Sequence, residues 1–239
     1  MISTIEGSKS KEMRSFMSTV GALKTTNMIH IKSFTFNPFQ ENTYIAYDET
    51  KECIIVDPGC YDANENSILE NFIKQENLKP TALINTHCHL DHVFGNKFVA
   101  DSYNLSPIMH KLDLPMLEYA PLAATKYGVN LGELPPVHNF IEEGDLVKFG
   151  NSEFEVLFTP GHAPGHICLV SKKENIALSA DVLFHLSIGR TDLPMGDHET
   201  LLKSIREKLF VLDDAMIVYP GHGPKTSIGF EKENNPFLK

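Results

Sequence analysis

Long apolar runs and basic clusters are both missing from this 239-residue sequence. The longest apolar runs, such as residues 82–84 and 216–218, have the size of strands and fall far short of the roughly 20 residues that span a bilayer. Lysine and arginine cluster in groups of two or three at most, and the formal net charge is -10. These absences exclude a membrane span and argue against a nucleic-acid partner, which would attract a basic surface.

Cysteine is also scarce. The four cysteines, at positions 53, 60, 88 and 168, form no CxxC pair and lack the density of a disulfide scaffold. This usage fits a reducing compartment, so we expect a cytoplasmic protein.

The first 27 residues differ in pattern from the rest of the chain. Lys11 and Arg14 precede a short, mildly apolar stretch at 16–23, which resembles a poor signal peptide. Polar residues interrupt that stretch and no convincing cleavage site follows it, so we expect residues 1–27 to be a poorly ordered N-terminal extension. The strand-like sequence begins at Met28, and with 42% hydrophobic residues overall we expect residues 28–239 to form one domain.

Short apolar runs rich in β-branched and aromatic residues alternate with turn signals after Met28. The pattern predicts helices at 64–77, 91–103, 111–119 and 199–209, and strands near 29–36, 42–48, 52–56, 81–85, 106–109, 146–150, 153–158, 166–171, 175–180 and 216–219. Two strand-rich blocks, each followed by helices, indicate an α/β protein with two sheets packed face to face and helices outside. The polar stretch 120–145 is expected to be a long loop, and such loops are often functional.

A dense group of potential metal ligands follows the predicted strand that ends at Asn85. In Thr-His-Cys-His-Leu-Asp-His (86–92), His87 and His89 project to the same side of an extended loop, while Asp91 and His92 begin the next helix. Burying four imidazole and carboxylate groups beside an apolar strand would cost free energy unless a cation offset it. This spacing predicts a site for two adjacent metal ions.

Three more strand ends carry residues of the same chemistry. His162 lies in the Gly/Pro-rich loop 159–166, Asp181 follows the apolar run 176–180, and His222 lies in a tight turn after the strand 216–219. A single carboxylate such as Asp181 can bridge two cations. We expect Asp57 and His166 to contact and orient ligands rather than bind metal, and we expect the other histidines, at positions 30, 110, 138, 185 and 198, to be ordinary surface or core residues.

The order HxHxDH, then His, Asp and His, resembles the metallo-β-lactamase superfamily over residues 28–224. The resemblance implies a four-layer αββα sandwich. It also implies one metal bound by His87, His89 and His162 and a second bound by Asp91, His92 and His222, with Asp181 as the bridge.

Within that superfamily, the motifs THCHLDH and TPGHAPGH are similar to the glyoxalase II branch, as is the stretch 181–184. There a basic residue nine positions after the bridging aspartate contacts glutathione, which implies substrate binding by Arg190; an ion pair with Asp192 is the alternative. Two family tyrosines are replaced by Asp192 and Pro224, and only 15 residues follow Pro224 where the family has a helical extension. Much of the glutathione pocket is therefore expected to be missing.

We expect a metal-dependent hydrolase that cleaves a small-molecule thioester. Two ions that share a water are expected to lower the pKa of that water and present hydroxide to the thioester carbonyl. We expect Asp91 and Asp181 to act as catalytic residues that orient this hydroxide. Zinc suits imidazole and carboxylate ligands, and iron and manganese are alternatives. The rival functions are a mononuclear iron dioxygenase acting on persulfides, a lactonase or β-lactamase, and a metal-storage or interaction protein. The oligomeric state is not predicted.

Overall fold

The computed structural model describes residues 28–239. The prediction of a poorly ordered extension at residues 1–27 lies outside the described residues. Within residues 28–239, no helix combines the length and the apolar character that crossing a membrane requires.

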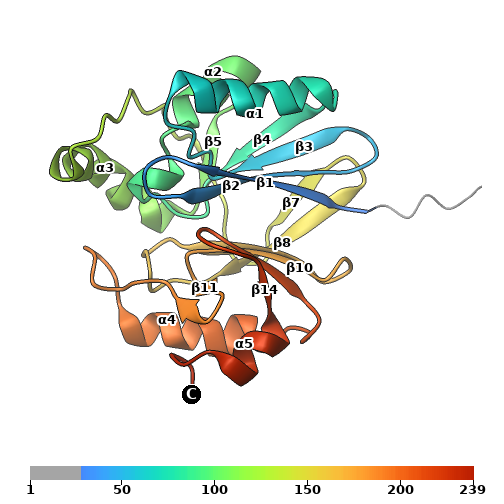
Figure 1. Cartoon of the computed structure of the whole chain (residues 1–239), viewed down its shortest axis with the longest axis vertical. Coiled ribbons are helices and arrows are strands. Elements are labelled where there is room, and N and C mark those ends of the chain that lie inside the picture. Colours follow the sequence, from blue (N-terminus) through green and yellow to red (C-terminus); the bar gives the residue numbers. More distant parts are fainter. Residues whose placement is uncertain (1–27) are drawn as a thin grey trace, which may run out of the picture.

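Two mixed sheets, each of six strands, form the centre of the domain (Figure 1). The first sheet runs in chain order through β1 (His30–Phe36), β2 (Glu41–Tyr47), β3 (Glu52–Val56), β4 (Lys79–Ile84), β5 (Pro107–Met109) and β6 (Asn139–Phe140). The second has the order β14 (Thr226–Ser227), β13 (Ile217–Pro220), β10 (Ile176–Ala180), β9 (Ile167–Ser171), β8 (Ser152–Phe158) and β7 (Leu146–Phe149). A small hairpin of β11 (Leu183–Phe184) and β12 (Ser187–Ile188) stands apart from both.

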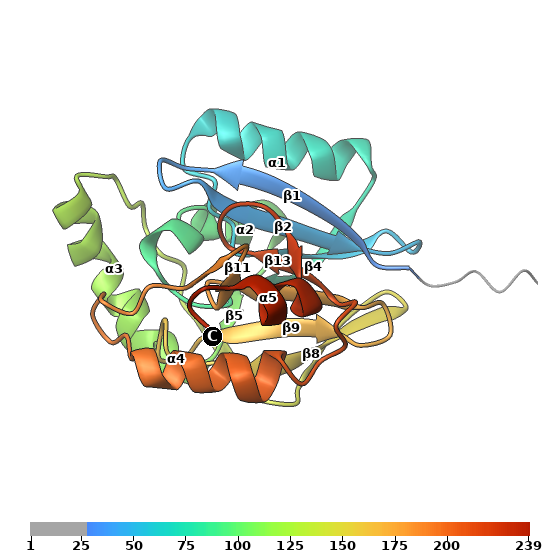
Figure 2. The ribbon, with the colours of Figure 1, turned by 60° about the horizontal axis from the view of Figure 1, so that its bottom comes forward.

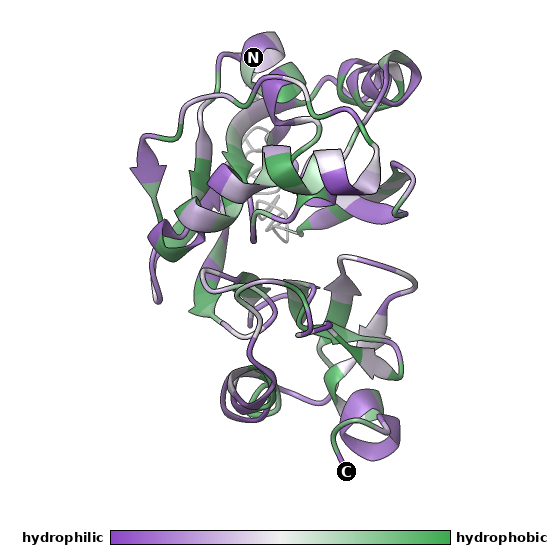
Figure 3. Ribbon diagram, turned by 90° about the vertical axis from the view of Figure 1, so that its left-hand side faces the viewer, coloured by the Kyte–Doolittle hydropathy of each residue, from purple (hydrophilic) through white to green (hydrophobic). Residues whose placement is uncertain are grey.

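Helices cover the outer face of each sheet. In Figures 1 and 2, α1 (Ala63–Gln75) and α2 (Asn96–Tyr103) lie over the first sheet, and α4 (His198–Ser204) and α5 (Ile228–Asn234) lie over the second. The helices carry both hydrophilic and hydrophobic segments in Figure 3, as expected where one side is buried and the other exposed. The predicted four-layer αββα sandwich is therefore confirmed.

Three apolar clusters hold the layers together. The cluster between the sheets joins Ile54 and Val56 of β3 to Val156 and Leu169 of β8 and β9. A second cluster packs α4 and α5 on the second sheet, and a third packs α1 and α2 on the first. Since apolar burial contributes about 25 cal/mol per Å², the first cluster stabilises the packing of the two sheets on each other, and the other two stabilise the packing of the helices on the sheets.

The helix predicted at 91–103 is interrupted in the structure. Residues Leu90–His92 form a 3-10 turn, and α2 begins only at Asn96, after Gly95. A side chain at position 95 would lie 2.3 Å from Sγ of Cys60 and 2.8 Å from the carbonyl oxygen of Pro58. Asp91 and His92 therefore lie in a tight turn before α2 and not in its first turn.

The helix predicted at 111–119 is longer than expected and enters the stretch predicted to be a loop. A 3-10 turn at Lys111–Asp113 leads into α3 (Leu114–Tyr127), which passes through Pro121 and ends at Gly128 with φ 67°. A proline inside a helix removes one backbone hydrogen bond. Burial of Met116, Ala120 and Ala124 on the inner side of the helix offsets that loss.

The sequence analysis did not predict several short elements, because they are too short to show a periodic pattern of apolar residues. These are β6, β11, β12, β14 and α5, each of two to seven residues. The helix predicted at 199–209 is present as α4, which continues into a π-helical turn at Ile205–Leu209.

Replacement of Leu169 by alanine tests the cluster between the sheets. Leu169 is fully buried, so the cavity should lower the free energy of unfolding by about 2–5 kcal/mol. Val211 is 72% exposed, and Val211→Ala should change the same quantity by less than about 0.5 kcal/mol. Urea denaturation of the two variants measures both values, and equal losses would contradict this account of the core.

Candidate metal centre

Four loops that follow strand ends converge on one edge of the sandwich. They follow β4, β8, β10 and β13, and they carry the segment 86–92 together with His162, Asp181 and His222. The side-chain amide of Asn42 in β2 donates to the carbonyls of Pro220 and Gly223 at 3.1 and 2.9 Å. The loop that carries His222 is thereby attached to the first sheet, which brings ligands from both sheets together.

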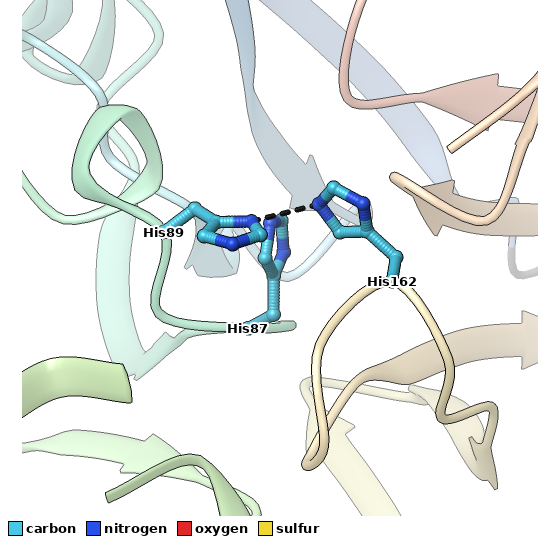
Figure 4. Close-up of side chains that lie close together, drawn as sticks. All are labelled: His87, His89 and His162. Carbon is cyan, nitrogen blue, oxygen red and sulfur yellow. Dashed lines mark hydrogen bonds between the residues drawn. The ribbon is translucent and has the colours of Figure 1, made fainter. Parts of the chain in front are cut away.

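Three histidines from two of these loops form the first group, shown in Figure 4. Nδ1 of His89 lies 2.7 Å from Nε2 of His162, and one nitrogen atom of each of the three rings lies within 4.8 Å of the others. Nδ1 of His162 faces the carbonyl oxygen of Arg190 at 2.7 Å, so it must donate and leave a lone pair on Nε2. Nδ1 of His87 pairs with the hydroxyl of Thr86 at 3.1 Å, while its Nε2 has no partner.

Asp91, His92 and His222 form the second group. Nε2 of His222 lies 3.2 Å from Oδ2 of Asp91, and Nε2 of His92 lies 3.7 Å from the same oxygen. A cation between these three atoms would have one carboxylate and two imidazole ligands.

Asp181 lies between the two groups. Its Oδ2 is 3.4 Å from Nε2 of His162 and 3.5 Å from Nε2 of His222, and its Oδ1 is 3.6 Å from Nε2 of His92. Its carboxylate therefore faces the first group and the second group at once. Gly221 permits this approach, since a side chain there would lie 2.0 Å from Oδ1 of Asp181.

The two groups differ in protonation. Burial lowers the pKa of His87 and His162, and it lowers the pKa of His89 to about 3, so these rings are neutral near pH 7. For His92 burial acts in the same direction, but the carboxylates of Asp91 and Asp181 outweigh it and raise the pKa. Burial also acts to lower the pKa of His222, but its hydrogen bond to Asp91 and the charges of Asp181 and Asp91 together outweigh burial and raise the pKa.

Several buried polar atoms at this edge have no hydrogen-bond partner among residues 28–239. They are Nε2 of His87, His89 and His92, Oδ1 of Asp181 and Oε1 of Glu41. A buried polar atom without a hydrogen bond costs about 1–3 kcal/mol. Imidazole and carboxylate ligands suit divalent metals, so the donor set fits metal ions.

Asp57 and His166 lie beside the two groups. Asp57 accepts hydrogen bonds from the amide and the hydroxyl of Thr86 at 2.7 and 2.5 Å, and it faces Nδ1 of His92 at 3.1 Å. Nε2 of His166 accepts from the amide of Asp181 at 3.2 Å, and its Nδ1 faces the hydroxyl of Thr159. Asp57 is close enough to His87 and His92 to form a third group, but these hydrogen bonds already engage its carboxylate oxygens.

Two buried carboxyl groups at this edge were missed by the sequence analysis. Asp113 accepts from the amides of Cys88 and Gly165, so it ties the two histidine loops together, and burial raises its pKa to about 6. Glu41 is fully buried with Oε1 at 4.0 Å from Nδ1 of His92, and burial raises its pKa well above the usual range. Nothing in the local pattern of either residue marks it, because its role depends on segments distant in the chain.

A pocket of about 560 Å³ opens over both groups. Its wall is formed mainly by apolar side chains of α3 and of the segment 184–194, and its lining includes Phe39, Leu90, Met116, Tyr119, Ala120, Ala123, Lys126, Tyr127, Phe184, Ile188, Arg190, Leu193 and Pro194. Arg190 therefore lines the pocket, as a substrate-binding residue must. Its guanidinium, however, makes two hydrogen bonds of 2.7 Å to the carboxylate of Asp192.

Known proteins are similar to this chain in sequence and in fold. Residues 36–222 match the family model of the Metallo-beta-lactamase superfamily. The chain is 37% identical to the hydroxyacylglutathione hydrolase GloC of Haemophilus influenzae, covering 88% of this chain and 98% of that protein. Among solved structures, the BLEG-1 B3 metallo-beta-lactamase is 36% identical with a TM-score of 0.79, covering 88% of this chain and all of that one. The protein TTHA1623 in a di-iron-bound form is 38% identical with a TM-score of 0.77, covering 87% of this chain and all of that one.

Metal should stabilise the folded chain, because it supplies partners for the buried nitrogen and oxygen atoms. A metal at 1,000 times its Kd adds about 4 kcal/mol, which corresponds to a rise in Tm of about 10 °C for a domain of this size. Circular dichroism melts of chelator-treated protein, with and without added Zn²⁺, measure the shift. His87→Ala should lose most of it, whereas His138→Ala, at an exposed histidine outside the groups, should retain it; equal shifts in both variants would count against a metal role for His87.

Proposed function

The chain belongs to the metallo-beta-lactamase superfamily and is a metallohydrolase, and from this premise we propose that it hydrolyses thioesters of the hydroxyacylglutathione kind with two metal ions. The observation that carries the proposal is the position of Asp181, whose two oxygens lie within 3.6 Å of histidines from both groups. A carboxylate that faces two sets of ligands is what a pair of neighbouring cations requires.

We assign each ion its ligands from the two groups. His87, His89 and His162 would hold one ion, and Asp91, His92 and His222 would hold the other, with Asp181 available to both. The neutral state of the first three histidines supports this assignment, because only a neutral imidazole has a lone pair to offer.

The chain supplies orientation and the ions supply activation. When bound, two divalent ions would supply an activated water and polarise the thioester carbonyl. Asp91 and Asp181 would accept hydrogen bonds from that water and orient it toward the thioester carbon. The water oxygen bonds to that carbon as the carbon–sulfur bond breaks; one water proton goes to the leaving sulfur and the other is released, so the products are a thiol and a carboxylate.

Zinc is our choice of metal, with iron and manganese as alternatives. A set of five imidazoles and two carboxylates accepts all three ions. The di-iron form of TTHA1623 keeps iron open as an alternative.

The thioester substrate is inferred from two observations. The relative GloC is named a hydroxyacylglutathione hydrolase and matches this chain over nearly its whole length. The pocket over the metal centre has a volume within the range of sites for small molecules. A β-lactam is the second candidate, because the similar BLEG-1 structure is described as a B3 metallo-beta-lactamase.

We also propose a cytoplasmic location. All four cysteines are buried and free, and burial raises the pKa of Cys53 and Cys168 to about 12. Thiols held in this way fit a compartment that keeps cysteine reduced.

A substrate panel tests the proposed reaction. Metal-loaded protein should hydrolyse S-lactoylglutathione faster than nitrocefin or a lactone, and it should take up no oxygen with a persulfide. Asp181→Ala should reduce thioester hydrolysis by more than about 100-fold, since loss even of a residue that only supports a ligand costs 10- to 100-fold. His138→Ala is the matched control; near-normal turnover by metal-replete Asp181→Ala would disprove the two-metal mechanism.

Acidification should remove the two ions in order. Because the pKa values of His92 and His222 are raised, protons compete with metal for these ligands at a higher pH than for His87, His89 and His162, whose pKa values are lowered. Metal content per chain should therefore fall from two to one as the pH drops through about 6.5, and reach zero only at a lower pH. Elemental analysis after equilibration between pH 8 and 4 measures this, with His222→Ala showing only the later loss. Simultaneous loss of both ions would contradict the assignment.

A further inference from the structure

The pocket has two cationic side chains in its lining besides the histidines, Lys126 and Arg190. They lie on different elements, Lys126 in the last turn of α3 and Arg190 in the loop after β12. If the substrate of the proposed reaction is anionic, one of them must face its charge.

The charge of Arg190 is already matched by a carboxylate. Nε and one terminal nitrogen of its guanidinium donate to the two oxygens of Asp192, both at 2.7 Å. The hydrogen bonds from Arg190 lower the pKa of Asp192 to about 2, so that carboxylate is ionised throughout the physiological range. A substrate carboxylate at Arg190 would have to displace Asp192 or lie beside it, against like-charge repulsion.

The charge of Lys126 is not matched in this way. Within the described part of the chain its ammonium contacts Tyr119, donating to the hydroxyl at 2.5 Å and lying 5.1 Å from the ring centre, and it pairs with no carboxylate. Both of these contacts leave the positive charge in place. Lys126 and Tyr119 therefore offer a cation and a hydroxyl at one point of the pocket wall.

The wall that carries Lys126 is firmly attached. Ala120 and Ala124 of α3 pack against Leu90 between the metal-binding residues, and Tyr127 makes an edge-on contact with Phe39 at 5.4 Å between ring centres. The end of α3 is thereby fixed relative to the metal centre. Lys126 has a defined position, although its flexible side chain reaches solvent.

The lining of the pocket changes in chemistry and in exposure. Asp91, Asp181 and three histidines line it beside an uncharged wall along α3, in which Met116 and Ala120 are buried and Ala123 is half-buried, whereas Lys126 at the end of the helix is exposed. Lys126 adds a positive charge to that wall. A matching ligand has its reacting carbonyl at one end, an uncharged body and an anionic group at the other end.

We propose that Lys126, supported by Tyr119, binds the carboxylate of an anionic thioester and is the cation that selects the substrate, in place of Arg190. This inference rests on the proposed function. It makes the substrate a thioester whose thiol part ends in a carboxylate, as the glycine end of a glutathione conjugate does. Because the whole chain carries a net charge of -10, a local cation is also needed to offset its repulsion of such a substrate.

Steady-state kinetics with two substrates tests this proposal. S-lactoylglutathione carries carboxylates, whereas S-lactoyl-N-acetylcysteamine is an uncharged thioester with the same acyl group. Lys126→Met should raise the KM for S-lactoylglutathione about five-fold at unchanged kcat, the size expected for loss of a solvent-accessible ion pair, and leave the uncharged substrate unaffected. Lys126→Arg should restore the KM, and Arg190→Ala should change it by less than about two-fold.

Two results would overturn the proposal. One is an equal change for both substrates in Lys126→Met, which would indicate a structural effect; the other is a selective rise in KM in Arg190→Ala alone. Calorimetric binding of S-methylglutathione, which cannot be hydrolysed, separates this inference from the proposed reaction. If wild type cleaves no thioester but binds S-methylglutathione through Lys126, the reaction is wrong and the subsite stands; if Lys126→Met binds S-methylglutathione as wild type does, the subsite is wrong.

Discussion

The buried carboxylate of Asp181 is the constraint on which the rest of the site depends. Removing an ionised carboxylate from water costs several kcal/mol of free energy unless opposite charges and hydrogen bonds replace the water. Three histidines lie within 3.6 Å of this one, and His166 binds the backbone amide of the same residue. The chain before it is bent, with φ 40° at Ala180, and Gly189 is packed so closely that a side chain there would lie 1.9 Å from the carbonyl oxygen of Asp181.

The electrostatic difference between the two halves of the site follows from this arrangement. Burial of His87 and His89 and the other imidazoles beside them lower the pKa of both rings, so the neutral form is favoured. His92 faces Asp91, Asp181 and Asp57, so the protonated form is favoured. The two groups thus differ in how strongly their imidazoles hold a proton.

Sequence predicted the parts of the site that are local. The segment 86–92 carries four potential ligands in seven residues, and His162, Asp181 and His222 each follow an apolar strand, so a strand pattern and a list of donors predicted that these residues would meet. Their division between two metals came from the family resemblance. Asp113 and Glu41 were missed because their carboxyl groups matter only through contacts with distant loops. Lys126 was missed because Pro121 led us to predict a loop from residue 120 onward, whereas α3 continues to Tyr127. The part of the pocket wall formed by the end of that helix was therefore not predicted.

The hydrogen bonds from Asn42 to the loop that carries His222 join positions 178 and 181 residues apart. Contacts of such long range form late in folding, because a long stretch of chain must first be brought together. During synthesis, the segment 86–92 leaves the ribosome well before Asp181 and His222. A nascent chain therefore presents only part of the donor set, and the complete set forms only when both sheets have docked.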